Sequence, residues 1–84
     1  MRIFHERTMR ILVFMKNGND LSYKQLKKRN IVNNIATYYW WVSHLRDMNL
    51  ITKKNKKFIL TKKGEEFAKV FEELLKVYEK YFGD

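Results

Sequence analysis

The fold is decided by residues 33–51, which read NNIATYYWWVSHLRDMNLI. We interpret residues 34–48 as one helix, because the Asn33 side chain can cap its first turn and Asn49 tolerates the left-handed conformation that ends many helices. Apolar residues recur along this stretch at helical spacing and predict an inner face. The residues of that face are Ile35, Tyr38, Val42 and Leu45.

The opposite side of this helix carries Thr37, Trp40 and His44. These side chains stack, form hydrogen bonds and make van der Waals contacts, whereas a solvated helix face usually carries Lys and Glu. A helix that is buried on one side and exposes such groups on the other is suited to contact the bases of a nucleic acid. The alternative is a fully buried helix, with Trp40 and Trp41 in the core or in a contact between two chains.

The composition limits the classes of protein to consider. Eighty-four residues make one small domain, which often needs an oligomeric partner to bury enough surface. Cysteine is absent, which excludes a disulfide framework and a Cys-based zinc site, and the two histidines lack the spacing of metal ligands. No apolar run has the length of a signal peptide or a membrane span. We therefore expect a cytoplasmic protein that uses neither a membrane nor a cofactor.

The charge is distributed unevenly along the chain, whose net charge is +9. Residues 1–64 contain fifteen Lys or Arg and three Asp or Glu, whereas residues 65–84 contain three basic and six acidic residues. The first part therefore has a net charge of +12 and the last part −3. This asymmetry favours a polyanionic partner for the first part. The alternative is a basic surface that only confers solubility.

Two further helices are predicted before residue 33. Residues 3–16 form the first, with Ile3 and Phe4 on its apolar face, and residues 17–20 form a turn. Residues 21–29 form the second, in which Ser22 followed by Gln25 fits a capping box. Together with the helix at 34–48, this second helix gives a helix-turn-helix pattern.

Residues 50–60 predict a two-stranded hairpin with Asn55 at its tip. An isolated hairpin is only marginally stable in water, so Leu50, Phe58 and Leu60 are expected to pack on the helices. The residues that crowd the tip are Lys53, Lys54, Lys56 and Lys57. Their mutual repulsion is relieved if a phosphate backbone lies beside them, where counterion release adds to binding.

A last helix is predicted over Lys62–Phe82, with Thr61 as its cap. At about 30 Å it is longer than a core of this size requires, so part of its apolar surface is expected to pair with a second copy of the chain. The residues predicted for that contact are Phe67, Val70, Phe71, Leu74, Val77, Tyr78 and Tyr81. The alternative is that they fold back onto the first helix of the same chain.

These elements predict a mainly helical winged helix-turn-helix domain. Residues 1–61 form its body and residues 62–84 its dimerisation helix. Residues 45–51 resemble the L-x-x-x-G-L-I signature that ends the recognition helix in many winged-helix regulators of the MarR and PadR groups, with Asn49 in place of Gly. Residues 60–64, LTKKG, resemble the L-T-x-K-G start of their last helix. The chain is especially similar to small archaeal winged-helix proteins that dimerise through a long C-terminal helix.

The residues and the resemblance together imply a homodimeric, nucleoid-associated regulator that binds double-stranded DNA. The residues expected near the bases are Asn33, Asn34, Thr37, Trp40, Trp41 and His44. Those expected at phosphates or at the minor-groove edge are Lys24, Lys28, Arg29, Lys53, Lys54, Lys56 and Lys57.

Two other functions compete with this one. They are an architectural protein that coats DNA without sequence preference, and a protein-interaction module that docks through its aromatic residues. An enzyme is disfavoured, because the sequence contains no carboxylate pair, nucleophile–base set, metal cluster or phosphate-binding glycine loop.

Overall fold

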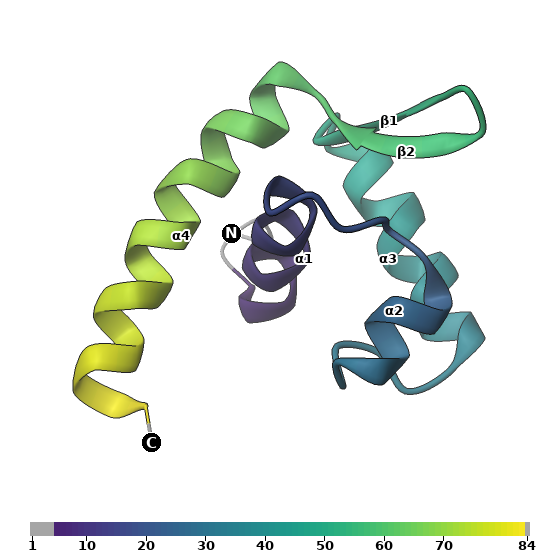
Figure 1. Cartoon of the computed structure of the whole chain (residues 1–84). Coiled ribbons are helices and arrows are strands. Elements are labelled where there is room, and N and C mark those ends of the chain that lie inside the picture. The colour runs from purple at the N-terminus through teal and green to yellow at the C-terminus, as the bar shows by residue number, and fades with distance from the viewer. Residues whose placement is uncertain (1–4, 84) are drawn as a thin grey trace.

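Helices and one hairpin follow one another along residues 5–83, the part of the chain that the computed structural model describes (Figure 1). The elements are α1 (Glu6–Lys16), α2 (Tyr23–Lys28), α3 (Ile35–Asp47), β1 (Ile51–Lys54), β2 (Lys57–Leu60) and α4 (Lys62–Phe82). The strands pair antiparallel. The order confirms the predicted fold class, mainly helical with a small hairpin and a long last helix, and it is winged-helix-like.

Three helices begin at a side chain that accepts a hydrogen bond from the backbone N–H three residues later. The capping residues of α2, α3 and α4 are Ser22, Asn34 and Thr61. Ser22 and Thr61 confirm the predicted caps. The prediction of Asn33 as the cap of α3 is wrong: of two adjacent asparagines the second accepts the bond, and the helix starts one residue later.

Helix α1 occupies the centre of the molecule, with α4 on one side and α2 and α3 on the other (Figure 1). It begins at Glu6, and the predicted start at Ile3, with Phe4 on the apolar face, lies outside the described residues. The core around α1 takes side chains from every helix and from the segments that join them. The apolar side chains without any exposure include Ile11, Leu12, Leu26, Leu45, Leu50, Ala68 and Phe71.

The predicted inner face of α3 is confirmed at three of its four positions. Tyr38, Val42 and Leu45 are buried. Ile35 is 45% exposed, so its assignment to the inner face is wrong. As the first residue of the helix it lies beyond the core, at the edge of a cleft described below.

The end of α3 and the start of α4 meet at one backbone junction. The Thr61 hydroxyl donates to the carbonyl oxygen of Asn49 at 2.7 Å, and the Thr61 backbone N–H donates to the carbonyl oxygen of Leu50 at 3.0 Å. Gly64 lies so close to the same Leu50 carbonyl that a Cβ on it would overlap the oxygen. Asn49 has a φ of +61°, which confirms its predicted left-handed conformation. We call this contact the Asn49–Gly64 junction.

The predicted bounds of α4 are confirmed, but its apolar residues have two different environments. Phe71 is fully buried and Phe67 is partly buried against the core, so assigning Phe71 to a surface between chains is wrong. Phe71 belongs to the hydrophobic core, and α1 is the main partner of α4. The other residues predicted for that surface remain exposed, namely Val70, Leu74, Val77, Tyr78 and Tyr81.

One ion pair also joins α1 to α4, with Lys16 Nζ lying 3.0 Å from Glu72 Oε1. The hydrogen bond from Lys16 lowers the pKa of the Glu72 carboxyl. No helix within residues 5–83 has both the length and the apolar run needed to cross a bilayer.

The Asn49–Gly64 junction generates a first prediction. Replacing Gly64 with Ala places a Cβ where the Leu50 carbonyl oxygen lies, so the backbone at residue 64 and the backbone of Leu50 must move apart. We expect the free energy of unfolding to fall by about 2 kcal/mol, within the range for overpacked sites. Urea denaturation followed by circular dichroism measures this change. Lys62→Ala, at an exposed position in the same turn, is the matched control and should leave stability within about 0.5 kcal/mol of the native value. Equal stabilities of the two variants would contradict the tight junction.

Candidate functional site

The exposed side of α3 is made of small and aromatic residues. We define the α3 outer face as Ala36, Tyr39, Trp40 and Ser43, all of which are exposed. Trp40 is 57% exposed, which confirms its predicted outward position. Thr37 and His44, predicted on the same side, are only partly exposed and lie on its flank. The outer face itself carries no charged side chain.

Trp41 does not belong to this face. Its side chain is only 5% exposed, so counting it among the residues that contact a partner is wrong. One helical step of about 100° separates it from Trp40 and turns it towards α1. There its ring centroid lies 5.2 Å from that of His5, which directly precedes α1.

Trp40 is held by its neighbours even though it is exposed. Its ring stacks on His44 with centroids 4.8 Å apart and an interplanar angle of 18°. Its other contact is edge-to-face with Trp41, at 4.9 Å and 86°. Because Trp41 is itself packed on His5, these four residues form a continuous aromatic cluster that reaches from α3 to the start of α1. We call it the Trp40 cluster.

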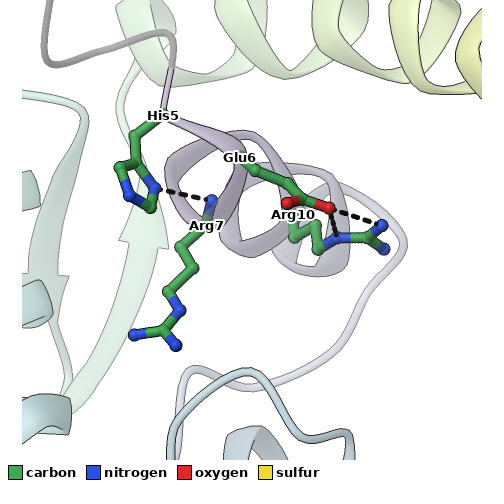
Figure 2. A network of polar contacts seen from close by, with 4 residues as sticks. All are labelled: His5, Glu6, Arg7 and Arg10. Carbon is green, nitrogen blue, oxygen red and sulfur yellow. Dashed lines mark hydrogen bonds and ion pairs between the residues drawn. The ribbon is translucent and has the colours of Figure 1, made fainter.

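The start of α1 supplies polar groups beside this cluster. The His5 Nδ1 atom accepts a hydrogen bond from the Arg7 backbone N–H at 3.0 Å and so caps α1. Figure 2 shows the His5 and Arg7 side chains on one side of the helix and the Glu6–Arg10 ion pair, 2.9 Å long, on another. The Arg7 guanidinium has no carboxylate partner among residues 5–83. The sequence pattern did not single out His5 or Arg7.

The two asparagines before α3 differ in what they offer. Asn33 and Asn34 are both exposed. The Asn34 Oδ1 atom already accepts the capping bond from the Thr37 backbone N–H, at 2.9 Å. Asn33 makes no such bond within residues 5–83, so both the oxygen and the NH2 group of its side-chain amide are free to form hydrogen bonds with a partner. It lies at the N-terminal end of α3, and in known DNA-binding proteins this end of the recognition helix contacts base edges.

A cleft of about 400 Å³ separates α3 from the hairpin, which we call the wing. Ile35 and Tyr39 line its helix side, and the wing side carries Lys53, Lys56 and Lys57. Its floor is fixed by the buried Tyr38, whose hydroxyl donates to the Leu21 carbonyl oxygen at 2.9 Å. Burial raises the pKa of the Tyr38 phenol. Part of the α3 outer face and three wing lysines therefore border one hollow.

The predicted wing hairpin is confirmed, and its turn is unusual. Lys54 pairs with Lys57, which leaves a two-residue turn of Asn55 and Lys56. Their φ angles are +51° and +68°, the left-handed conformation that the twist of a tight hairpin favours. Asparagine adopts this conformation readily, whereas lysine does so at a cost of about 1 kcal/mol that glycine would avoid. The turn thus keeps a cation at a position suited to glycine.

The wing lysines are hardly neutralised. Lys53, Lys54 and Lys56 have no carboxylate partner among residues 5–83. Lys57 lies 4.0 Å from Asp20, but both side chains are largely exposed, and such a pair contributes little. We call Lys53, Lys54, Lys56 and Lys57 the lysine tip.

One aromatic ring connects the lysine tip to α3. The Phe58 ring has Lys53 Nζ at 5.5 Å and the Arg46 guanidinium at 5.9 Å from its centroid. Both distances suit cation–π contacts, which place the two charges around one ring in the outer half of the wing. Arg46 was missed by the sequence pattern, because nothing in the spacing shows that the end of α3 meets Phe58.

The basic residues of α2 do not form one group. Lys24 and Lys28 are exposed, as predicted. Arg29 lies 5.4 Å from the Phe14 ring and lines a separate hollow with residues of α1 and α4, including Glu72. Arg29 was predicted to contact the DNA backbone together with Lys24 and Lys28; it follows α2, is exposed, and lies beside residues of α1 and α4, and that contact stays a prediction.

Comparison with known proteins finds no relative: neither a protein-family model nor a curated protein nor a solved structure matches the chain. Within residues 5–83 there is also no group of His, Asp and Glu side chains placed to hold a metal ion. What the site does must therefore be inferred from its own residues.

The wing turn generates a second prediction. Replacing Lys56 with Gly removes the conformational cost at a φ of +68°, so we expect the free energy of unfolding to rise by about 1 kcal/mol. Lys54→Gly, at an extended strand position, is the control and should lower stability instead. Thermal and urea denaturation measure both changes. A loss of stability in Lys56→Gly would show that this lysine makes a stabilising contact.

Proposed function

We propose that the protein binds double-stranded DNA as a homodimeric transcriptional regulator. In this proposal the α3 outer face enters the major groove and the lysine tip lies on the adjacent phosphates. The observation that carries it is the cleft in which Tyr39 of α3 faces Lys53, Lys56 and Lys57 of the wing. Uncharged contact groups and exposed cations border the same hollow there.

The separation of charge supports DNA over other polyanions. In protein–DNA interfaces, cations hold phosphates and fix the register, while uncharged or hydrogen-bonding groups meet the base edges. The α3 outer face is uncharged, and the lysine tip beside it lacks strong carboxylate partners within residues 5–83. A helix fits the width of the major groove, and a short hairpin beside it can follow the backbone.

The conformation of Lys56 supports a binding role for the wing. A residue kept in a costly backbone conformation suggests a use for its side chain. At the tip of a two-residue turn, the only property that lysine has and glycine lacks is a long cationic side chain. A phosphate contact is a use that fits this property.

The proposed dimer rests on the exposed stripe of α4. Val70 and Val77 lie seven residues apart on this stripe and are both more than half exposed, and Leu74 lies between them. Covering such a stripe with the same stripe of a second chain removes apolar surface from water, and a two-fold arrangement allows each copy to cover the other.

A second candidate function is DNA binding without sequence preference. It is favoured by the composition of the α3 outer face, because Ala36, Tyr39, Trp40 and Ser43 include no Arg, Asn or Gln to make bidentate contacts with a base. Competition between genomic fragments and unrelated duplexes in a gel-shift assay distinguishes the two functions. Equal competition would favour an architectural protein, and a preferred fragment would favour a regulator.

The lysine tip generates the prediction that tests DNA binding. We expect Lys53→Ala, Lys54→Ala and Lys56→Ala together to weaken binding to every duplex and to reduce the slope of log K against log salt by about 2 to 3, near 0.9 per lost phosphate contact. Fluorescence anisotropy from 50 to 300 mM salt measures both.

The matched control removes the same charge from α4, through Lys62→Ala, Lys69→Ala and Lys80→Ala. These lysines are exposed and lie outside the wing. The control should bind nearly as well as the native chain. If both triple variants lose the same affinity for DNA, the binding reflects net charge alone. If the native chain binds no duplex at 100 mM salt, the function of a protein-interaction module is favoured instead.

The exposed stripe of α4 generates a further prediction. Light scattering should give the native chain twice the monomer mass, and Val77→Glu should give the monomer mass, because the contact would bury an unpaired carboxylate. Lys62→Glu adds negative charge at the exposed start of the same helix and should remain dimeric. A native chain that stays monomeric at micromolar concentration would contradict the dimer.

A further inference from the structure

We infer that Trp40 determines the sequence specificity of the protein by recognising the C5 methyl group of thymine in the major groove. The inference rests on the proposed function and deepens it, since it names what the α3 outer face would read.

Trp40 is both exposed and fixed. More than half of its side chain is exposed, yet its ring stacks at 18° on His44 and meets Trp41 edge-on. Trp41 is buried and packs on His5, so the support reaches from α3 to α1. A side chain held in this way loses little conformational entropy on binding, so its contacts contribute more of their gross energy to affinity.

The part of Trp40 that His44 and Trp41 do not contact remains accessible to a partner. Its neighbours one turn before and nearly one turn after, Ala36 and Ser43, are small and exposed. No residue of 5–83 accepts a hydrogen bond from the Trp40 indole N–H. The ring therefore offers a partner an apolar surface and one hydrogen-bond donor.

An apolar surface with one hydrogen-bond donor suits one base better than the others. Among the base edges in the major groove, only thymine presents an apolar group, its C5 methyl, and it carries an acceptor, O4, beside it. Placing an indole against the edge of cytosine, adenine or guanine removes water from polar groups without replacing all their hydrogen bonds, which is unfavourable. Thymine is the base whose edge suits Trp40 best.

The experiment removes only the methyl group. A duplex is first selected from a random pool by binding to the native chain, and each thymine in it is then replaced in turn by deoxyuridine, which lacks the C5 methyl. At one or two positions we expect the native chain to bind about fourfold more weakly, the factor that corresponds to one buried methylene-sized group. Trp40→Ala should bind the thymine and uracil duplexes equally well.

Phe82→Ala is the matched control, because it removes an exposed aromatic side chain that lies outside both the α3 outer face and the wing, and it should keep the sensitivity to the methyl group. Circular dichroism checks that both variants fold. If the native chain binds the duplex but is insensitive to every replacement, or if Trp40→Ala keeps the native sensitivity, the inference is overturned while DNA binding stands. Preference for single-stranded DNA over the duplex would also overturn it, and failure to bind any duplex would overturn the proposed function as well.

Discussion

The arrangement of α3, the wing and α4 depends on the Asn49–Gly64 junction. A threonine side chain and backbone bind two consecutive carbonyl groups at the end of α3, and a glycine allows the first turn of α4 to lie directly on one of them. The wing comprises the residues between Leu50 and Thr61, so its base is fixed by the same contacts that start α4. Any displacement of α4 is therefore coupled to the wing and to the end of α3.

The division of the chain into core helices and a wing allows the aromatic α3 outer face and the lysine tip to lie near each other on a small domain. The core takes the buried sides of α1, α3 and α4, which leaves α3 free to expose small and aromatic residues. The cations are carried by a hairpin that contributes mainly Ile51, Phe58 and Leu60 to the interior. Within the hairpin, core packing and most of the charge thus lie on different residues, so the lysines can vary with little effect on the core.

Much of the fold could be predicted from the sequence, because its signals are local. The Thr61 cap, the turn at Asn49 and the hairpin each follow from the chemistry of a few adjacent residues, and the structure confirms them. The errors occur where the outcome depends on distant contacts. Trp40 and Trp41 are adjacent and of the same type, so only the position of α1 decides which is buried. Phe71 was misplaced for the same reason, because its burial depends on the core against which α4 packs.

The register of the wing limits how its length can change. Lys53 is paired with Phe58, so both lie on the side that carries Ile51 and Leu60, whereas Lys54 and Lys57 lie on the opposite side. Successive residues of a strand point to opposite sides of the sheet. Inserting one residue into each strand between the Ile51–Leu60 pair and the Lys53–Phe58 pair would therefore turn Phe58 outwards into solvent. A longer wing that preserves the arrangement must therefore grow by two residues in each strand, which extends its reach in steps of nearly 7 Å.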